Sequence, residues 1–245
     1  MAAGVGGSQN HREKNMHLTY NQENREKWLE QTLKKIPAGL RILDAGAGEL
    51  KYKKFCSHLQ YVSQDFGQYD GTGDGAGLHT EKWDQTRLDI VSDIISIPEL
   101  DGAFDAVMCI EVLEHVPRPD EALRELARLL RPGGFLVLTA PFASLTHMAP
   151  YFFQTGYSRY FYQHWFEKLN LEILDLQENG NYFDYLAQEL YRLPSVAIRY
   201  SSDSLTWLEN KALNIVNNAL GRFSVKDAGS SEFLCFGIHI LARKK

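Results

Sequence analysis

The residues best placed to bind a charged ligand are carboxylates and glycines that follow short apolar stretches. Asp44 comes after the apolar pair Ile42-Leu43, and Gly46 and Gly48 follow it with one residue between them. Glycine lets the backbone approach a ligand closely and adopt positive φ values. Asp65 ends the next apolar stretch, about 20 residues further along the chain. The carboxyl ends of parallel strands are where open α/β sheets bind ligands, so this pattern predicts a binding site there.

The glycine spacing can be compared with that of a dinucleotide-binding turn. Such a turn needs a third glycine three residues after the second, and Lys51 stands at that position. A pyrophosphate also prefers bare backbone N–H groups at a helix start, whereas this turn carries Asp44 and Glu49. An acidic turn instead favours a ligand with a cationic group, such as the sulfonium and ammonium of S-adenosylmethionine.

Further motifs follow the acidic turn in a fixed order. They are a second strand over Leu59–Asp65, a third over Asp89–Ile94, a fourth strand and its loop over Phe104–Val116, and a fifth strand over Arg131–Pro141. Together with the first turn, their order and spacing resemble the motifs of class I S-adenosylmethionine-dependent methyltransferases. The resemblance extends over Arg41–Leu176.

This resemblance implies the cofactor S-adenosyl-L-methionine and a set of residues that contact it. Asp65 would accept both ribose hydroxyls, Asp93 would meet the adenine amine, and Ile94 would pack on the ring. Glu111 would lie near the methionine ammonium. The complete set of expected cofactor-binding residues is Asp44, Ala45, Gly46, Gly48, Asp65, Asp93, Ile94 and Glu111.

Methyl transfer to a hydroxyl also needs a group that removes its proton, and histidine titrates near neutral pH. His147 lies just past the fifth predicted strand, within Pro141–Phe152, on the rim where acceptors enter. With Arg159-Tyr160, this segment is similar to a methyltransferase branch often found with polysaccharide and lipid-sugar assembly. We therefore take His147 as a candidate general base, with a structural role in the loop as the alternative.

A second candidate is His115, which follows the fourth predicted strand. The spacing Glu111-x-x-Glu114-His115 resembles ubiquinone-pathway O-methyltransferases and small-RNA 2'-O-methyltransferases, in which these side chains hold a magnesium ion. Carboxylate oxygens with one imidazole suit such an ion. Many related enzymes keep Leu-Glu-His with no metal, so both interpretations remain open and the metal is unassigned.

The resemblance implies an α/β fold with a Rossmann-like, doubly wound, seven-stranded sheet that is mostly parallel with an antiparallel last strand. Apolar periodicity and helix-breaking residues predict the flanking elements. They are a helix over Gln22–Ile36, a helix-forming stretch after Gly48, a helix from Pro119 to Pro132-Gly133, a helix over Ser158–Leu169, a strand over Leu171–Leu176 and a last strand over Glu232–Leu241.

The domain organisation follows from composition and connection lengths. Residues 1–15 are rich in glycine, serine and charge and predict a disordered tail, and residues 16–245 predict one methyltransferase domain. The connection over about 177–231 is far longer than usual and contains helical stretches, which predicts a helical cap or a dimer interface. A second glycine-rich segment, Gly67–Leu78, predicts a loop anchored by Trp83.

Composition excludes several other classes. The 245-residue chain has 44% hydrophobic residues, a net charge of -5 and no run of Lys and Arg, which argues against DNA or another nucleic acid as the main partner. Three cysteines without metal-like spacing indicate free thiols in a reducing compartment. No apolar run approaches the roughly 20 residues that span a bilayer. We therefore expect a cytoplasmic protein that meets a small-molecule acceptor and can form a homodimer.

The expected function is methyl transfer from S-adenosylmethionine to a small molecule, with a hydroxyl of a sugar or sugar-linked intermediate as the leading acceptor. One alternative is a magnesium-assisted O-methyltransferase of a phenolic or quinone-like compound or an RNA end. Another is a catalytically silent cofactor-binding subunit. The atom methylated, the oligomeric state and the role of the insert are left undetermined by the sequence.

Overall fold

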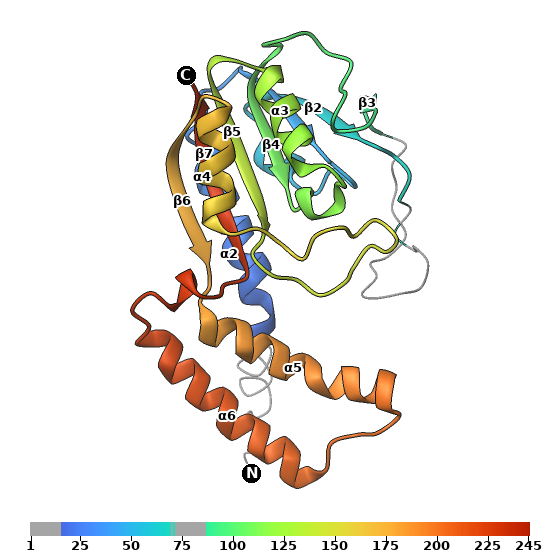
Figure 1. Ribbon diagram of the computed structural model, residues 1–245, viewed down its shortest axis with the longest axis vertical. Helices are drawn as coiled ribbons and strands as arrows, with labels where there is room; N and C mark the ends of the chain where they lie inside the picture. The colour runs from blue at the N-terminus through green and yellow to red at the C-terminus, as the bar shows by residue number, and fades with distance from the viewer. Residues whose placement is uncertain (1–15, 70, 72–86) are drawn as a thin grey trace, which may run out of the picture. The chain divides into compact units, whose positions relative to one another are not determined.

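A seven-stranded sheet with the order β3-β2-β1-β4-β5-β7-β6 forms the centre of the computed structural model, which describes residues 16–69, 71 and 87–245 (Figure 1). The strands are β1 Arg41–Ala45, β2 Gln60–Asp65, β3 Ile90–Val91, β4 Phe104–Ile110, β5 Leu130–Pro141, β6 Leu171–Asn179 and β7 Gly237–Lys244. The pairs from β3 to β5 are parallel, and β7 runs antiparallel to β5. The predicted fold class is confirmed.

The strand order reverses at β1, which pairs in parallel with β2 on one side and with β4 on the other. Leu43, for example, lies opposite Val62 of β2 and Val107 of β4. The connections leaving β1 and β4 therefore run to opposite sides of the sheet, and it is in the crevice beyond the carboxyl ends at such a point that open α/β sheets bind ligands. This topology places the acidic turn after β1 where such sheets bind ligands.

The central strand β4 is buried on both faces, which explains why its residues are mostly apolar rather than alternating. On one face, Met108 of β4 packs in a cluster with Trp28 and Leu33 of α2 (Met16–Leu33). Side chains alternate along a strand, so the buried neighbours Val107 and Cys109 face the other way. Figure 1 shows α3 (Pro119–Leu129) and α4 (Arg159–Lys168) together in front of the sheet.

Most predicted elements are present, but the stretch after Gly48 differs. The expected helix is wrong: the chain forms turns and a single 3₁₀ turn, η1 (Lys53–Phe55), before β2 begins at Gln60. Leu50 has a φ of 62°, which interrupts helical geometry at once.

The last strand begins later than the apolar run predicted. Ser230–Glu232 form a 3₁₀ turn, η3, and β7 starts at Gly237. Phe236, directly before β7, is buried, and its ring lies 6.1 Å from that of Tyr185 in the helical region. The apolar residues directly before Gly237 therefore pack against the helical region and do not pair with a strand.

The chain divides into two compact units. The larger consists of Lys27–Gln177 with Gly237–Lys245 and contains the acidic turn; the smaller consists of the residues up to Glu26 and Glu178–Phe236. The smaller unit contains α5 (Tyr182–Ser201) and α6 (Trp207–Val225), so the predicted insert is helical. Its proposed roles as a cap or dimer interface stay predictions.

Side-chain caps define where both insert helices begin. The Asn181 side chain accepts hydrogen bonds from the N–H groups of Phe183 and Asp184, and Thr206 with Glu209 forms the same reciprocal arrangement at α6. These capping boxes satisfy N–H groups that have no partner within the helix. The predicted tail, most of the Gly67–Leu78 loop and its anchor Trp83 lie outside the described residues.

Candidate active site

The turn after β1 is shaped by glycine in a way that no other residue could reproduce. Gly46 has a φ of 83°, and a Cβ at this position would lie 2.4 Å from Cγ2 of Val112. The N–H groups of Gly46 and Ala47 both donate to the carbonyl oxygen of Gln64, at 2.9 and 2.8 Å. The turn is thus held against the end of β2, and its own backbone lines the crevice.

Asp65, the last residue of β2, ties this turn to the loop beyond β2. Its carboxylate accepts from the N–H of Gly48 and the N–H of Gly67, both at 3.0 Å, and the residue is only 5% exposed. The two predicted cofactor-binding positions, Gly48 and Asp65, are therefore in direct contact. Ala45 is buried beside them in β1, opposite Gln64.

Asp44 is buried at the end of β1, and its Oδ2 accepts a 2.6 Å hydrogen bond from the hydroxyl of Tyr61. Burial raises the pKa of Asp44 to about 7; the Tyr61 hydrogen bond opposes this shift, and the charge of Asp65 adds to it. A cationic ligand beside this carboxyl would favour its charged form. Tyr61 was not expected at the site, and only its place on the neighbouring strand could have suggested it.

Three further predicted positions lie at neighbouring strand ends. Glu111 follows β4 with a φ of 56°, and its Oε1 accepts a 2.8 Å hydrogen bond from Oγ1 of Thr139. Asp93 is exposed and Ile94 is buried just past β3, whose Val91 pairs with Asp65. The predicted cofactor-binding residues therefore come from four strand ends along one edge of the sheet.

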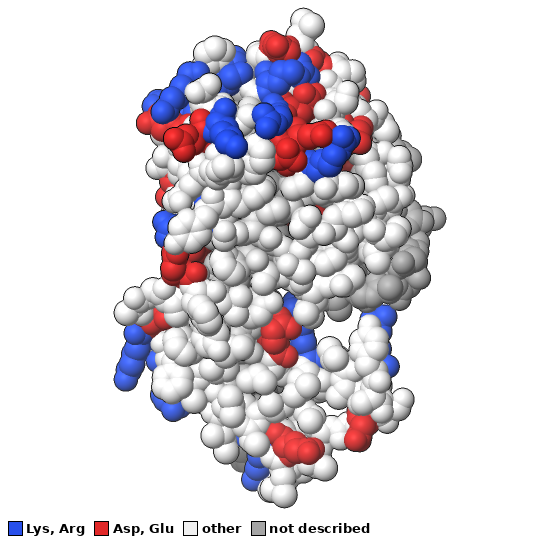
Figure 2. Space-filling model, viewed as in Figure 1, with Lys and Arg blue, Asp and Glu red and all other residues white. Residues whose placement is uncertain are grey.

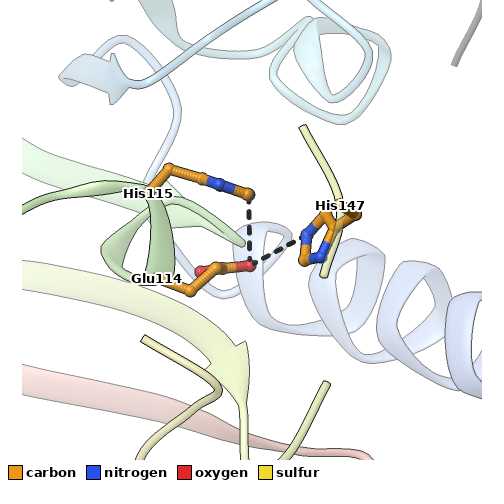
Figure 3. Close-up of side chains that lie close together, drawn as sticks. All are labelled: Glu114, His115 and His147. Atoms are coloured by element: carbon orange, nitrogen blue, oxygen red, sulfur yellow. Dashed lines mark ion pairs between the residues drawn. The ribbon is translucent and has the colours of Figure 1, made fainter. Parts of the chain in front are cut away.

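A second cluster of titratable side chains, the Glu114 cluster, consists of Glu114, His115 and His147 (Figure 3). Oε1 of Glu114 lies 3.7 Å from Nε2 of His115 and 3.9 Å from Nε2 of His147. These distances are too long for direct hydrogen bonds. The Glu114 side chain is fully buried, whereas the His147 side chain is 27% exposed, so the cluster opens to solvent on its His147 side.

The second nitrogen of each imidazole is engaged by a backbone carbonyl, which determines the tautomer. Nδ1 of His115 lies 2.5 Å from the carbonyl oxygen of Tyr151, and Nδ1 of His147 lies 2.9 Å from that of Leu145. With the proton on Nδ1, Nε2 of each ring faces the carboxylate of Glu114 and, in the uncharged tautomer, carries the lone pair. Burial, with a smaller contribution from His147, lowers the pKa of His115 to about 4, so His115 is neutral at physiological pH.

His147 reaches this cluster because the loop after β5 is fastened onto the 3₁₀ turn η2 (Leu113–His115). The N–H groups of Phe153 and Gln154 donate to the carbonyl oxygen of Glu114 at 3.0 and 3.2 Å. The Tyr157 hydroxyl donates to that of Leu113 at 2.7 Å. These contacts join two segments about forty residues apart, and they could not be anticipated from the spacing of the histidines.

Aromatic rings connect the Glu114 cluster to the β2 end. The Phe152 ring centre lies 5.0 Å from that of His147, and the Tyr151 ring meets the edge of Phe66 at 5.0 Å. Phe66 directly follows Asp65, so one continuous surface runs from the acidic turn to the two imidazoles. Tyr151 and Phe152 belong to the segment predicted to lie where acceptors enter, whereas Phe66 was not expected at the site.

Comparison with known proteins agrees with this architecture. Residues 16–196 match the family described as a methyltransferase domain. This match covers most of the chain, which therefore belongs to the methyltransferase domain family. The family predicted from the motifs is confirmed.

Individual relatives cover less of the sequence. A ubiquinone biosynthesis O-methyltransferase of Xanthomonas oryzae pv. oryzae (strain PXO99A) is 37% identical over 105 residues, which are 42% of this chain and 43% of that protein. The chain thus aligns with under half the length of this curated relative.

Solved structures share the fold. An S-adenosylmethionine-dependent methyltransferase of Archaeoglobus fulgidus superposes with a TM-score of 0.52 at 15% identity, covering 91% of this chain and 94% of that one. Phosphoethanolamine N-methyltransferase 2 of Haemonchus contortus, solved with S-adenosyl-L-methionine, gives a TM-score of 0.52 at 14% identity over 91% of this chain and 52% of that one. Among the described helices, none is both long and apolar enough to cross a bilayer.

Proposed function

We propose that this protein is an S-adenosylmethionine-dependent O-methyltransferase whose acceptor hydroxyl is bound next to a divalent cation held by the Glu114 cluster. The observation that carries the proposal is the approach of two imidazole nitrogens and a carboxylate oxygen, which all lie within 4.8 Å of one another. Lone pairs directed at one another repel, and a cation between them turns that repulsion into coordination.

The cofactor is proposed to occupy the crevice beyond β1 and β2. Membership of the methyltransferase domain family supports this, and so does the acidic character of the turn. Asp65 would accept the ribose hydroxyls, Asp44 and Glu111 would face the cationic end, and Asp93 with Ile94 would hold the adenine. Ala45, Gly46 and Gly48 would contribute backbone in close approach to the ligand.

The donor set of the Glu114 cluster fits a divalent ion. Ligand atoms lie about 2 Å from such an ion, so two ligands of one ion are at most about 4 Å apart. The separations of 3.7 and 3.9 Å from Oε1 of Glu114 meet this limit. The hydrogen bonds from Nδ1 to backbone carbonyls are also the usual outer support of histidine ligands. When bound, the ion would act as a Lewis acid that lowers the pKa of the acceptor hydroxyl, so that its proton passes to solvent water and the oxygen that receives the methyl group is held as an oxyanion.

This proposal gives His147 and His115 a role different from proton removal. An imidazole with its proton on Nδ1 has a single lone pair, at Nε2, and a ligating nitrogen cannot also accept a proton. We therefore assign both histidines to holding the cation. The base role predicted for His147 becomes the competing hypothesis, and metal binding by variants separates the two.

The acceptor is proposed to be a small aromatic hydroxyl compound. Phe66, Tyr151 and Phe152 present aromatic rings between the acidic turn and the cluster, and such rings stack on planar ligands. The name of the 37% identical relative, a ubiquinone biosynthesis O-methyltransferase, points to the same class of acceptor. The sugar hydroxyl expected from the His147 segment stays a prediction, and a panel of catechols and sugars compares the two.

The decisive experiment measures cation binding and methyl transfer on the same samples. Chelator-treated protein is titrated with Mg²⁺, Mn²⁺ and Zn²⁺ by calorimetry, and transfer of labelled methyl is followed with each acceptor class. We expect one ion per chain and activity that chelation removes and the ion restores. His147→Ala should weaken ion binding about 100-fold, because one of three protein ligands is lost.

His164→Ala provides the matched control, since His164 is exposed on α4. Retained ion affinity in His147→Ala together with a slow rate would instead support the general base. Full activity in the presence of chelator would contradict the cation while leaving the cofactor site intact. Absence of S-adenosylmethionine binding would overturn the proposal altogether.

A further inference from the structure

Glu111 holds a backbone conformation that residues other than glycine rarely adopt. Its φ is 56°, in the left-handed region, although it directly follows the regular strand β4. A non-glycine residue in that region costs conformational free energy and persists only where its surroundings hold it there. Such residues gather at binding sites, so the contacts that hold Glu111 indicate how this part of the site is built.

Thr139 of β5 holds Glu111 through two hydrogen bonds. The N–H of Glu111 donates to the carbonyl oxygen of Thr139 at 2.9 Å, and Oγ1 of Thr139 donates to Oε1 of Glu111 at 2.8 Å. The first bond fixes the backbone of Glu111, and the second fixes the direction of its carboxylate. One residue thus holds both the backbone and the side chain of this acid.

Thr139 is itself placed by the sheet. It lies opposite Ile110 of β4 and opposite His239 of β7, so strands on both sides hold its backbone. Its side chain is fully buried, between the buried residues Leu138 and Ala140. Packing alone would favour valine at this position, because valine has the same branched shape and no polar group to bury. The hydroxyl is therefore explained by its bond to the carboxylate.

The group that orients the Glu111 carboxylate is neutral. A Lys or Arg side chain could also orient a carboxylate, but it would oppose the negative charge that attracts a cationic ligand. Figure 2 shows that most charged side chains on this face of the larger unit gather near the C-terminus, where Nζ of Lys244 contacts the carbonyl oxygen of Leu130 at the start of β5. Thr139 lies near the opposite end of that strand. Its hydroxyl therefore directs the carboxylate without cancelling its charge.

We propose that Thr139 is a positioning residue for S-adenosylmethionine, which presents the Glu111 carboxylate to the ammonium group of the methionine part. The inference rests on the proposed cofactor site, in which Glu111 faces the cationic end of the ligand. The hydroxyl holds Oε1 in one direction before the ligand arrives, so binding does not have to order this side chain. The effect is confined to the amino-acid part, because the ribose is assigned to Asp65.

Two ligands that differ in the amino-acid part alone test this role. S-adenosylhomocysteine carries that part, whereas methylthioadenosine ends in a methyl group at the same sulfur, and neither is a sulfonium. Thr139→Val removes the hydroxyl and keeps the branched shape and the backbone bond to Glu111. By calorimetry it should bind S-adenosylhomocysteine about tenfold more weakly, while its affinity for methylthioadenosine stays within about twofold of the unaltered value.

Further variants separate the hydroxyl from the packing of Thr139. Thr139→Ser keeps the hydroxyl and should retain the affinity for S-adenosylhomocysteine, whereas Thr139→Ala should lose it as Thr139→Val does. Glu111→Gln should show the same selective loss, and adding Thr139→Val to it should cost little more, because both changes remove one interaction. Thr32→Val is the matched control, since Thr32 is a buried threonine of α2 in the same unit, and it should bind both ligands normally.

Three results would overturn the proposal while leaving the cofactor site intact. They are an equal loss of both ligands in Thr139→Val, which would indicate a structural role only, unchanged binding of S-adenosylhomocysteine by that variant, and a loss in Thr139→Ser as large as that in Thr139→Val. If the unaltered protein binds neither S-adenosylmethionine nor S-adenosylhomocysteine, the proposed function fails together with this inference.

Discussion

The acidic turn beyond β1 and the Glu114 cluster lie at the same edge of the sheet but are built differently. The acidic turn is held by backbone contacts between adjacent strands, such as the bond from the N–H of Gly48 to Asp65. The Glu114 cluster depends on a long loop that brings His147 beside His115. Rigid strand ends position one site, and a fastened loop positions the other.

The two sites nevertheless share an electrostatic property. Burial raises the pKa of Asp44 to about 7 and lowers the pKa of His115 to about 4, so each site disfavours its own charged form. Both gather electron-rich atoms that a positive charge would stabilise. The comparison teaches that two neighbouring sites of different construction can both favour a positive charge, which we propose to be a sulfonium at the acidic turn and a metal ion at the Glu114 cluster.

The largest expected effect concerns the Glu114 cluster. Glu114→Gln should reduce methyl transfer about 1,000-fold, because the charged ligand of the cation is lost while the shape is kept. Cofactor affinity should stay unchanged, since the acidic turn is built independently. Steady-state rates and calorimetry on the same preparation check both statements. Glu121→Gln, an exposed residue of α3, is the control. A rate within a few-fold of the unaltered enzyme would separate the cluster from catalysis.

A second effect concerns the backbone of the acidic turn. Gly46→Ala should weaken S-adenosylmethionine binding about 100-fold, because its Cβ would displace Val112 and the turn would move. Adding Val112→Ala should restore part of the affinity by relieving the contact. Gly39→Ala measures the cost of a positive φ alone, since Gly39 has a φ of 81° with no atom within 4 Å of its Cβ. Unchanged binding by Gly46→Ala would remove this turn from the site.

A smaller effect is expected from Asp65→Ala. Cofactor affinity should fall about tenfold or more, because two ribose hydroxyls lose a charged acceptor. The bonds to the N–H groups of Gly48 and Gly67 are lost as well, so the turn loosens. Asp89→Ala is the comparison. The Asp89 carboxylate accepts hydrogen bonds from the N–H and hydroxyl of Ser63, which lies on β2 as Asp65 does, but Asp89 lies away from the turn. Calorimetric titration of both variants shows whether losing either carboxylate weakens cofactor binding, or only the loss of the carboxylate that contacts the turn.

The smallest effect is the pH dependence of cofactor binding. The raised pKa of Asp44 means that its carboxyl is protonated in the folded, cofactor-free protein between its ordinary pKa and about 7. Its contribution to folding stability is therefore complete below the ordinary pKa and is lost as pH rises through about 7. A cationic ligand prefers the carboxylate, so affinity should rise a few-fold from pH 6 to pH 8.

Asp44→Asn should remove this pH dependence, whereas Tyr61→Phe should shift it to higher pH, because the Tyr61 hydroxyl lowers the pKa of Asp44. Binding measured across the pH range in two buffers also reports the released proton. A flat profile in the unaltered protein would show that Asp44 is charged already, and the comparison between the two sites would lose its electrostatic basis.

The two sites also differ in how far residue order alone could predict them. The acidic turn was predictable because Asp44, Gly46 and Asp65 sit at the ends of short apolar strands, and parallel strands bring their ends to one edge. Tyr61 and Val112 were missed, since their contacts with Asp44 and Gly46 depend on side-chain direction. The helix expected after Gly48 failed because local apolar spacing carries no information on the length available before β2.

The amino-acid sequence by itself determined the fold class, the acidic glycine turn and the methyltransferase family, because these depend on local patterns repeated in a fixed order. Tertiary structure alone decided that His147 joins Glu114 and His115, and that the Thr139 hydroxyl meets the carboxylate of Glu111. Both results arise from contacts between distant segments, whose geometry is set by packing and hydrogen bonding of the folded chain and is not encoded in the spacing of any one motif.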